Sequence, residues 1–402
     1  MKRLFSFLFI LILCLSMVGT VSAAPETIVL NVYNWGEYIS DGSEGTMNVN
    51  AEFEKYYERS FGQKVRVNYT TYASNEDMYN KLSSGAAVYD VIIPSDYMIQ
   101  RMITEDMLRP LDFSNIPNYR YIDPNYTNLY YDPDNLYSIP YTYGMVGIIY
   151  NTSMVDAEDI TDWDCMWNKK YAGKILQFNN PRDGMATAMF KLGVDINTTD
   201  KSELRAVTEE LKKQKPLIQS YVMDEIFNKM KTGSAAIAPY YAGDFLAMYE
   251  SNEALAFVYP ESGTNVFVDA FCIPKISRYP DVAEAYINFM LSKEPAIANA
   301  EYLYYASPNT LVTHDEGYME TMNDIHPDAM DILYPKDTDF KTQYYHNLDA
   351  DTLAYSNELW EELKIQNSIE PWILWTAGII LAFVVGLLLF KTIRSAYREK
   401  QY

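Results

Sequence analysis

The chain has little of the residue chemistry that catalysis and metal binding need. It contains three cysteines and three histidines among its 402 residues. It has no HExxH motif or paired-histidine spacing, no GxSxG elbow, no SxxK motif and no glycine-rich loop that could cradle a phosphate. Cys272 lies in the apolar run AFCIP, which favours a buried thiol, and the spacing gives no support for a disulfide to Cys165. The sequence therefore predicts no catalytic residues, no metal site and no cofactor.

Basic residues are also scarce. Asp and Glu number 54 against 32 Lys and Arg, which gives a formal net charge of −22. This balance argues against nucleic acid as a partner, because phosphate binding needs a basic face. An acidic surface attracts cations by long-range steering, although it serves solubility equally well. With 49% hydrophobic residues the chain can bury a core, and its length predicts roughly two to three domains.

The N-terminal residues have the pattern of a secretory signal peptide. Lys2 and Arg3 precede an apolar run, and the small residues that follow it predict cleavage after Ala23. Residues 1–23 are therefore expected to direct export.

Near the other end, residues 372–390 (WILWTAGIILAFVVGLLLF) carry no charge. As a helix this run would be about 28 Å long, which is enough to cross the hydrocarbon core of a bilayer. Lys391 and Arg394 follow it, so the positive-inside rule places the tail 391–402 in the cytoplasm. The sequence predicts a single-pass cell-membrane protein whose residues 26–370 lie on the extracellular, periplasm-equivalent side.

Between residues 27 and 109 the pattern alternates between strands and helices. The expected order is a strand at 28–32, a helix over 49–57 ended by Gly62, a strand at 65–69, a helix from Ser74 or Asn75 to about Gly85, a strand at 88–93 and a helix at 96–103. This βαβαβ order predicts a mostly parallel sheet covered by helices on both faces. Residues 110–140, rich in Pro, Asn, Asp and Tyr, are predicted to be loop.

A second α/β alternation follows. Strands are expected at 144–151, 174–179, 235–239 and 255–260, and helices at 204–213 and 281–291. The sequence shows no internal repeat or low-complexity linker. The predicted fold class is α/β, with two lobes followed by a short stem and a C-terminal transmembrane helix.

Aromatic rings and carboxylates follow several of the predicted strands. In an open sheet with strand order 2-1-3, ligands bind beyond the carboxyl ends of strands one and three. Those strands end in YNWGEY (33–38) and PSDY (94–97), and strands of the second lobe run into NNPRDG (179–184), YYAGD (240–244) and FVDAF (267–271). Ring faces stabilise cations, and ammonium groups donate to carboxylates. The mixture indicates a site for an organic ammonium, although 36 tyrosines make chance pairs of ring and acid common.

One known family is similar to this chain over residues 28–365. The spermidine/putrescine-binding proteins of bacterial ABC importers resemble it in NVYNWGEYIS (31–40), TYASNEDMYNKL (71–82), YDVIIPSDYMIQRM (89–102), YSIPYTYG (137–144), KLGVDINTTD (191–200) and YASPNT (305–310). The resemblance implies a two-lobed type II periplasmic-binding-protein fold. Lobe 1 would comprise residues 26–140 plus 268–312, and lobe 2 residues 141–267 plus 313–366. The lobes would close about hinges near Tyr141–Gly144 and Phe267–Asp269.

The same resemblance implies ligand-binding residues from both lobes. They are Trp35, Glu37, Tyr38, Ser95, Tyr97, Asn180, Asp183, Tyr240, Phe267, Asp269, Tyr305 and His346. The acids among them would bind ammonium groups, and the rings would line the methylene chain. The chain departs from the family at three positions, because Asn180 stands where the family often has Asp, and Tyr240 and Phe267 stand where it often has Trp. These departures leave open which polyamine is bound.

The implied partners are a polyamine, the permease subunits of an ABC importer and the membrane, with no nucleic acid. A membrane anchor is not typical of the soluble periplasmic members. Two alternatives stay open, namely a polyamine-sensing ectodomain and the same fold binding another small solute, such as an amino acid or an iron complex. Arg182 is the only basic residue in the nominated loops, which disfavours an amino acid because its carboxylate usually needs an arginine.

Overall fold

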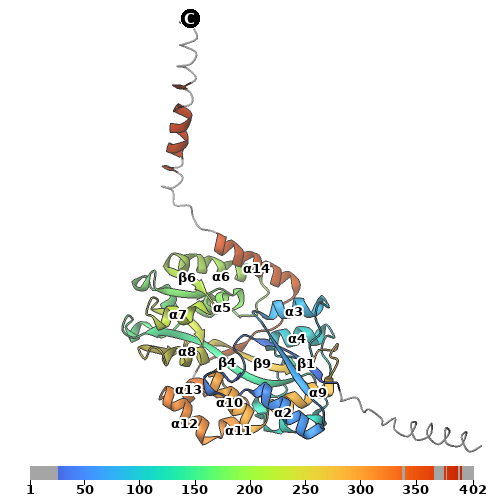
Figure 1. Cartoon of the computed structure of the whole chain (residues 1–402). Coiled ribbons are helices and arrows are strands. Elements are labelled where there is room, and N and C mark those ends of the chain that lie inside the picture. The colour runs from blue at the N-terminus through green and yellow to red at the C-terminus, as the bar shows by residue number, and fades with distance from the viewer. Residues whose placement is uncertain (1–25, 337–339, 366–374, 377, 388–389, 392–402) are drawn as a thin grey trace, which may run out of the picture.

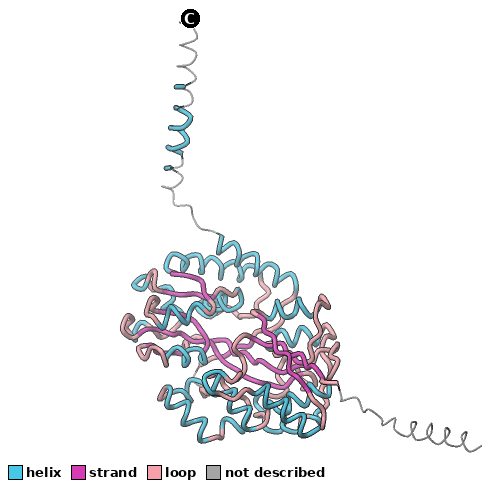
Figure 2. The backbone as a smooth tube through the Cα atoms, viewed as in Figure 1, coloured by secondary structure: helices cyan, strands magenta, loops and turns pink. Residues whose placement is uncertain are grey.

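The structure is a computed structural model that describes residues 26–336, 340–365, 375–376, 378–387 and 390–391. A continuous β-sheet runs through both of its lobes. Its strands are β1 (Ile28–Trp35), β2 (Val65–Tyr72), β3 (Val91–Ile92), β4 (Ser138–Asn151), β5 (Ile175–Phe178), β6 (Ile218–Val222), β7 (Ile237–Tyr241), β8 (Leu255–Val258), β9 (Thr264–Cys272) and β10 (Thr342–Tyr344). The order is β2-β1-β3-β9-β4-β7-β5-β6, with β10 beside β9 and β8 beside β4. The strands lie in the interior and helices surround them (Figure 2).

The helices that cover the sheet follow the order expected of an α/β fold (Figure 1). They are α2 (Val49–Phe61), α3 (Asn75–Ser83), α4 (Asp96–Thr104), α5 (Pro181–Leu192), α6 (Lys201–Gln214), α7 (Glu225–Lys231), α8 (Ala242–Tyr249), α9 (Pro280–Met290), α10 (Lys293–Leu303), α11 (Thr310–Thr313), α12 (Glu316–Ile325), α13 (Ala329–Leu333) and α14 (Ala350–Ile365). Short 3-10 turns occupy much of residues 113–126 and 157–171.

The first βαβαβ unit confirms the prediction for residues 27–109. β1 pairs in parallel with β2 on one side and β3 on the other, which is the expected 2-1-3 order. Asn48 caps the start of α2, and Gly62 ends it in a left-handed conformation with φ 71° that glycine adopts readily. Ser74 caps α3, and its hydroxyl accepts from the amide of Asp77. These caps fix the two strand-to-helix turns next to the site.

Two long strands carry the chain between the lobes. β4 and β9 pair antiparallel from Ser138 opposite Cys272 to Met145 opposite Val266, with an irregular register between Pro140 and Thr142. Beyond that point β4 continues along β7 and β8. The sequence predicted loop up to residue 140 and a strand only from 144, which is wrong because residues 138–143 are paired with β9. Pro140 argued against a strand in the sequence, because proline occurs within strands only at edges and at irregular positions. The register of β4 is irregular at Pro140, and the strand accommodates the proline there.

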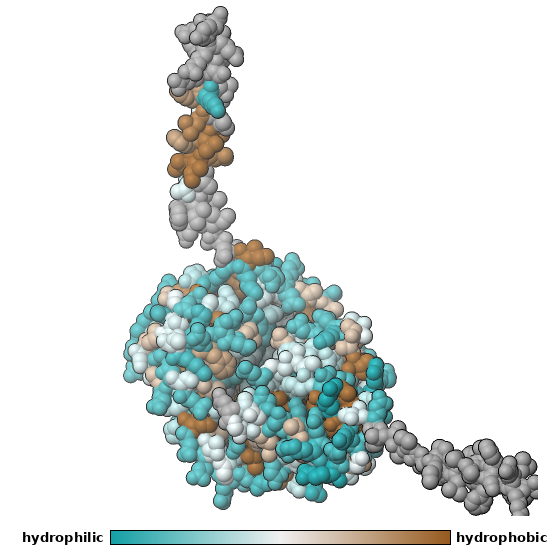
Figure 3. Space-filling view, viewed as in Figure 1, coloured by the Kyte–Doolittle hydropathy of each residue, from teal (hydrophilic) through white to brown (hydrophobic). Residues whose placement is uncertain are grey.

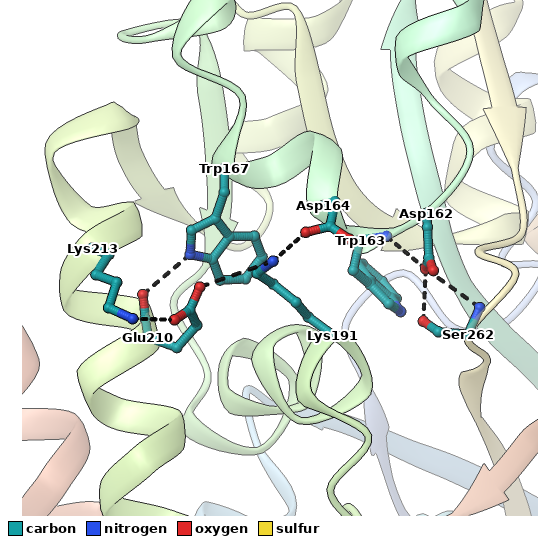
Figure 4. A network of polar contacts seen from close by, with 8 residues as sticks. All are labelled: Asp162, Trp163, Asp164, Trp167, Lys191, Glu210, Lys213 and Ser262. Atoms are coloured by element: carbon teal, nitrogen blue, oxygen red, sulfur yellow. Dashed lines mark hydrogen bonds and ion pairs between the residues drawn. The ribbon is translucent and has the colours of Figure 1, made fainter.

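A network of polar contacts fixes the C-terminal end of α5 in the second lobe. At the C-terminal end, Lys191 forms ion pairs with Asp164 and with Glu210 of α6, and the Trp167 indole donates to the Glu210 carbonyl at 3.1 Å (Figure 4). Lys213 contacts the same Glu210 carboxylate at 2.7 Å. The network joins α5, α6 and the turn at 163–167, and so it orients the N-terminal end of α5, where Asn180 and Asp183 lie.

The two cysteines in the described residues are buried and unpaired, so no disulfide joins Cys165 to Cys272. Cys272 is fully buried at the end of β9, as the apolar run predicted.

The predicted membrane segment is covered only in part. In the described ranges we find no helix with the length and apolar character required to cross a bilayer. Residues 378–387 are helical, lie apart from the lobes, and expose apolar side chains such as Ile379 and Phe383, which are 64% and 68% exposed (Figure 3). The predicted signal peptide 1–23 and the predicted tail beyond Lys391 lie outside the described residues.

Candidate functional site

The turn after β1 brings a tyrosine to the strand crossing. β1 ends at Trp35, and the chain then turns through Gly36 and Glu37, which has a positive φ of 50°. This turn buries the Tyr38 side chain, whose hydroxyl lies 2.6 Å from the Thr142 hydroxyl of β4 and donates to Asp269 of β9 at 2.7 Å. Glu37 itself is exposed. The stretch YNWGEY therefore reaches both strands that connect the lobes.

Asp269 is the most unusual acid of the site. Its side chain is 4% exposed, and one carboxylate oxygen, Oδ2, accepts from Tyr38. The other oxygen, Oδ1, is buried and has no hydrogen-bond partner among the described residues. Burial raises the pKa of Asp269 to about 6, and the nearby Ser95 and Tyr38 hydroxyls oppose that rise. A buried carboxylate with an unsatisfied oxygen is costly, and a bound cation would remove that cost.

Residues at the start of α4 extend this side of the site. The Asn75 amide donates to the Ser95 hydroxyl at 3.0 Å and to the Tyr97 hydroxyl at 3.1 Å, and its oxygen accepts from the Ser95 amide. Ser95 also forms an isolated bridge with Asp269. The fully buried Asp96 accepts from the Val268 amide at 3.2 Å, and burial raises its pKa to about 8. The loop after β3 is thus fixed against β9.

Asp183 lies on the second lobe, at the N-terminus of α5. It is 6% exposed, and three side chains donate to it. Oδ2 accepts from the Asn180 amide at 2.7 Å and from the Tyr241 hydroxyl at 2.8 Å, while Oδ1 accepts from the Tyr345 hydroxyl at 3.0 Å. Burial raises its pKa, and the two tyrosines and Arg182 oppose that rise. Asn180 also caps α5, so it positions the acid through the backbone and the side chain together.

A row of rings joins the two acids. The Tyr38 ring lies 5.6 Å from that of Tyr305, which lies 6.0 Å from Phe267, which in turn lies 5.4 Å from Tyr241. All three pairs are edge-to-face, the geometry that aromatic quadrupoles favour. Gly144 on β4 permits this packing, because a Cβ there would lie 2.7 Å from the Phe267 ring. The row runs from Asp269, beside Tyr38, to Asp183, beside Tyr241.

A further acid meets this row from α8. Asp244 accepts from the Tyr305 hydroxyl at 2.8 Å. Its pKa is raised to about 7, mainly by burial and further by the nearby charges of Asp224 and Glu37. Glu37 and Asp244 therefore lie close enough to interact, although one belongs to the first βαβαβ unit and the other to the second lobe.

The remaining nominated residues lie in different surroundings. Trp35 packs on Tyr72 at 4.7 Å, and its indole nitrogen is buried without a partner among the described residues. Tyr240 is buried in the core of the second lobe and stacks on Phe178 at 5.4 Å. His346 is exposed and stacks on Tyr130 at 4.4 Å. It lies on the rim, where its carbonyl accepts from Arg182.

Several residues of the site are absent from the set that the resemblance implies. They are Asn75, Arg182, Tyr241, Asp244 and Tyr345. The strand-end pattern had already indicated Tyr241 and Asp244 in YYAGD, and Arg182 follows another predicted strand end in NNPRDG. Tyr345 follows the short edge strand β10, which has no sequence signal of its own.

Two α/β lobes joined by paired crossing strands, with acids and rings from both lobes facing one another, define a solute-binding protein. The chain belongs to the family of bacterial extracellular solute-binding proteins, whose pattern matches residues 51–323.

Relatives with known ligands cover most of the chain. The spermidine/putrescine-binding periplasmic protein of Salmonella typhimurium is 30% identical over 344 residues, which is 85% of this chain and 93% of that protein. The putrescine-binding periplasmic protein PotF of Escherichia coli is 28% identical over 74% of this chain and 81% of its own length. The solved spermidine/putrescine ABC transporter substrate-binding protein PotD of Streptococcus pneumoniae matches with a TM-score of 0.69 and 34% identity, covering 84% of this chain and 99% of that one.

Proposed function

We propose that this chain is the substrate-binding component of an ABC importer and binds a polyamine, spermidine or putrescine, between its lobes. The observation that carries the proposal is the buried Oδ1 of Asp269, which has no partner among the described residues. The other oxygen of Asp269 accepts from Tyr38, the first ring of the row that reaches Tyr241 of the second lobe. The names of the relatives support the same ligand class.

Each part of the site has a role in binding a flexible dication. One ammonium group donates to Asp269, at about 1.5–3 kcal/mol per charged hydrogen bond. A second ammonium meets Asp183, where an ionised carboxylate with three donors keeps one accepting position. The rings of Tyr38, Phe267 and Tyr305 cover the methylenes and stabilise the charges, at about 0.5–2 kcal/mol per cation–π contact.

The other nominated residues support these groups. Glu37 and Asp244 add negative charge at the Asp269 end, and Ser95 orients Asp269. Trp35 and Tyr97 line the side of the first lobe, Asn180 holds Asp183, and Tyr240 backs Tyr241. His346 closes the rim.

Ligand capture involves closure of the two lobes, with boundaries at residues 140/141, 267/268 and 312/313. The first two boundaries fall within the paired strands β4 and β9. Closure buries the ammonium groups and gives the permease subunits a loaded form to recognise.

The protein is held at the cell membrane by residues 372–390, with the lobes outside the cell and the tail 391–402 in the cytoplasm. The exposed apolar side chains of residues 378–387, such as Val384 and Leu387, support this proposal, because an aqueous surface rarely carries so many together. Residues 1–23 direct the export.

Titration calorimetry on the full chain in mild detergent tests the ligand. Putrescine and spermidine should give saturable heat, and a panel of amino acids should give none. Binding of an amino acid without polyamine binding would overturn the assignment.

A further inference from the structure

Five lysines lie on or beside β6, the outermost strand of the sheet in the second lobe. They are Lys174, Lys215, Lys229, Lys231 and Lys364, and we call them the lysine edge. None of the five forms an ion pair with a carboxylate in the part of the chain that the structure describes. Other lysines of this lobe, such as Lys170 and Lys213, do form such pairs, so the lysine edge keeps its positive charge free for a partner.

Hydrogen bonds gather three of these lysines near the start of β6. The side-chain oxygen of Gln219 on β6 accepts from Lys229 Nζ at 3.2 Å, and its amide nitrogen donates to the Ser234 carbonyl at 2.8 Å. Lys174 Nζ donates to the same Ser234 carbonyl at 3.3 Å. Lys231 lies in the last turn of α7 together with Lys229. Three ammonium groups therefore lie close together at one place on the surface.

The chain leaves the second lobe beside this strand. Lys215, just before β6, donates to the carbonyl oxygens of Leu363 at 2.5 Å and Lys364 at 3.2 Å, in the last turn of α14. A cation is favourable at this end of a helix. α14 packs along α6 and ends at Ile365 (Figure 1). The proposed anchor begins at residue 372, and seven residue steps can extend about 25 Å at most. The anchor therefore keeps the lysine edge close to the membrane.

Acids are scarce around the lysine edge. Residues 212–231 hold five lysines against two acids, Asp224 and Glu225, which gives +3 in a chain of net charge −22. Glu225 is close enough to Lys229 to interact with it. On α14, two basic residues of α6 contact Glu362 at 2.8 Å each, whereas the exposed Glu361 has no ion pair among the described residues. Positive charge therefore prevails here, in contrast to the rest of the chain.

Resting on the proposed membrane anchor, we propose that the lysine edge binds anionic lipid headgroups and holds the second lobe against the membrane. An anionic membrane surface attracts basic residues within about 8 Å at physiological ionic strength, and each lysine favours the bound form by about fivefold. The acidic remainder of the chain is repelled by the same surface. The contact thus orients both lobes and leaves the first lobe free to move when the lobes close.

Lysine footprinting on the unmodified full chain gives the first test. The chain is incorporated in nanodiscs of phosphatidylcholine, with or without phosphatidylglycerol, and methylated with formaldehyde, a neutral reagent, before mass spectrometry. Lys174, Lys229 and Lys231 should react several-fold more slowly in the anionic nanodiscs, and about 0.5 M salt should abolish this protection. Lys81 of the first lobe should react equally in both. Equal rates for the edge lysines in the two nanodiscs would overturn the proposal, because lysines that only prevent edge-to-edge pairing of sheets need no lipid.

Charge reversal then assigns the protection to the lysine edge. Lys231→Glu should reduce the protection of Lys174 and Lys229 to less than about twofold. Lys81→Glu is the matched control and should leave it unchanged. Lys81 and Lys231 each lie in the last turn of a helix and over an aromatic ring, at 4.7 and 5.7 Å, without a carboxylate ion pair among the described residues. If protection survives in both variants, the proposal is wrong. If Lys231→Glu does not fold, the comparison of the two nanodiscs still decides.

Two further readouts separate this contact from the proposed function. If the full chain does not stay in either nanodisc, the proposed anchor fails and the lipid contact is rejected with it. If the chain stays in the nanodiscs and its edge lysines are protected, but calorimetry shows no polyamine binding, only the proposed ligand fails. Lys231→Glu should leave the polyamine Kd unchanged, because Lys231 lies outside the proposed ligand site.

Discussion

Asp269 and Asp183 are two buried aspartates of the proposed site in different surroundings. Both are less than a tenth exposed, yet Asp183 accepts from three side chains beside an arginine, whereas one oxygen of Asp269 has no partner in the described part of the chain. Burying a charge is costly unless it is paired, so the three donors and Arg182 offset part of that cost at Asp183, whereas more of it remains at Asp269. The difference teaches that a cation gains most free energy at the carboxylate whose burial is least compensated in the empty protein.

Asp269→Asn should give the largest effect on binding. The polyamine Kd should rise by about 10- to 100-fold, because a charged hydrogen bond of about 1.5–3 kcal/mol is lost. The empty protein should become more stable, by about 1–3 kcal/mol, because the substitution removes a buried charge with an unpartnered oxygen. Calorimetry measures the first effect, and thermal unfolding without ligand measures the second.

Asp183→Asn is the matched control, and its effect on stability should have the opposite sign. Three donors lose a charged acceptor and would in part face the NH2 group of the new amide, so the empty protein should lose about 1–3 kcal/mol and unfold at a lower temperature. If both variants move the unfolding midpoint in the same direction, the contrast between the two acids is incorrect.

The pH dependence of binding should sharpen the comparison, with an effect on the order of tenfold. The pKa values of Asp269 and Asp244 are raised to about 6 and about 7, so both acids become protonated as the pH falls through that window. Only the ionised forms accept from an ammonium group, and the polyamine Kd should therefore rise between pH 8 and pH 5. The empty protein should respond in the opposite sense. A raised carboxyl pKa stabilises the fold at low pH, and this contribution is lost as the pH rises through 6 to 7.

Calorimetry and thermal unfolding across that range measure both trends. Asp244→Asn should remove the upper part of the change in Kd. A Kd that stays constant from pH 8 to pH 5 would show that these two acids do not hold the ligand.

Periodicity predicted the first βαβαβ unit well, because each element there carries its own pattern and caps, as with Ser74 and Gly62. It failed at residues 138–143, where the strand is held by pairing with β9 rather than by its own composition. Long-range pairing of this kind leaves little trace in a local window.

The residues of the candidate site were also predictable from the sequence only in part. Placement at strand ends indicated Tyr38 and Asp269, which the structure brings within 2.7 Å of each other. Placement at strand ends could not decide between Tyr240 and Tyr241 on β7. Successive side chains on a strand point to opposite faces, and the register of the strand decides which of them faces the space between the lobes. Tyr240 was nominated, and it is Tyr241 that donates to Asp183. Tyr345 is brought in by tertiary contacts alone.

Substitutions of Tyr240 and Tyr241 should give the smallest effect on the polyamine Kd. Tyr241→Phe removes one of the three donors to Asp183 and keeps the ring against Phe267, so the polyamine Kd should change by only a few-fold, for about 0.5–1.5 kcal/mol. Tyr240→Phe keeps the ring stacked on Phe178 in the core and should change the Kd by less than about twofold. Calorimetry on the two variants side by side measures the difference. If Tyr240→Phe weakens binding more than Tyr241→Phe does, the face of β7 that lines the site has been assigned to the wrong residue, because the two side chains point to opposite sides of the strand.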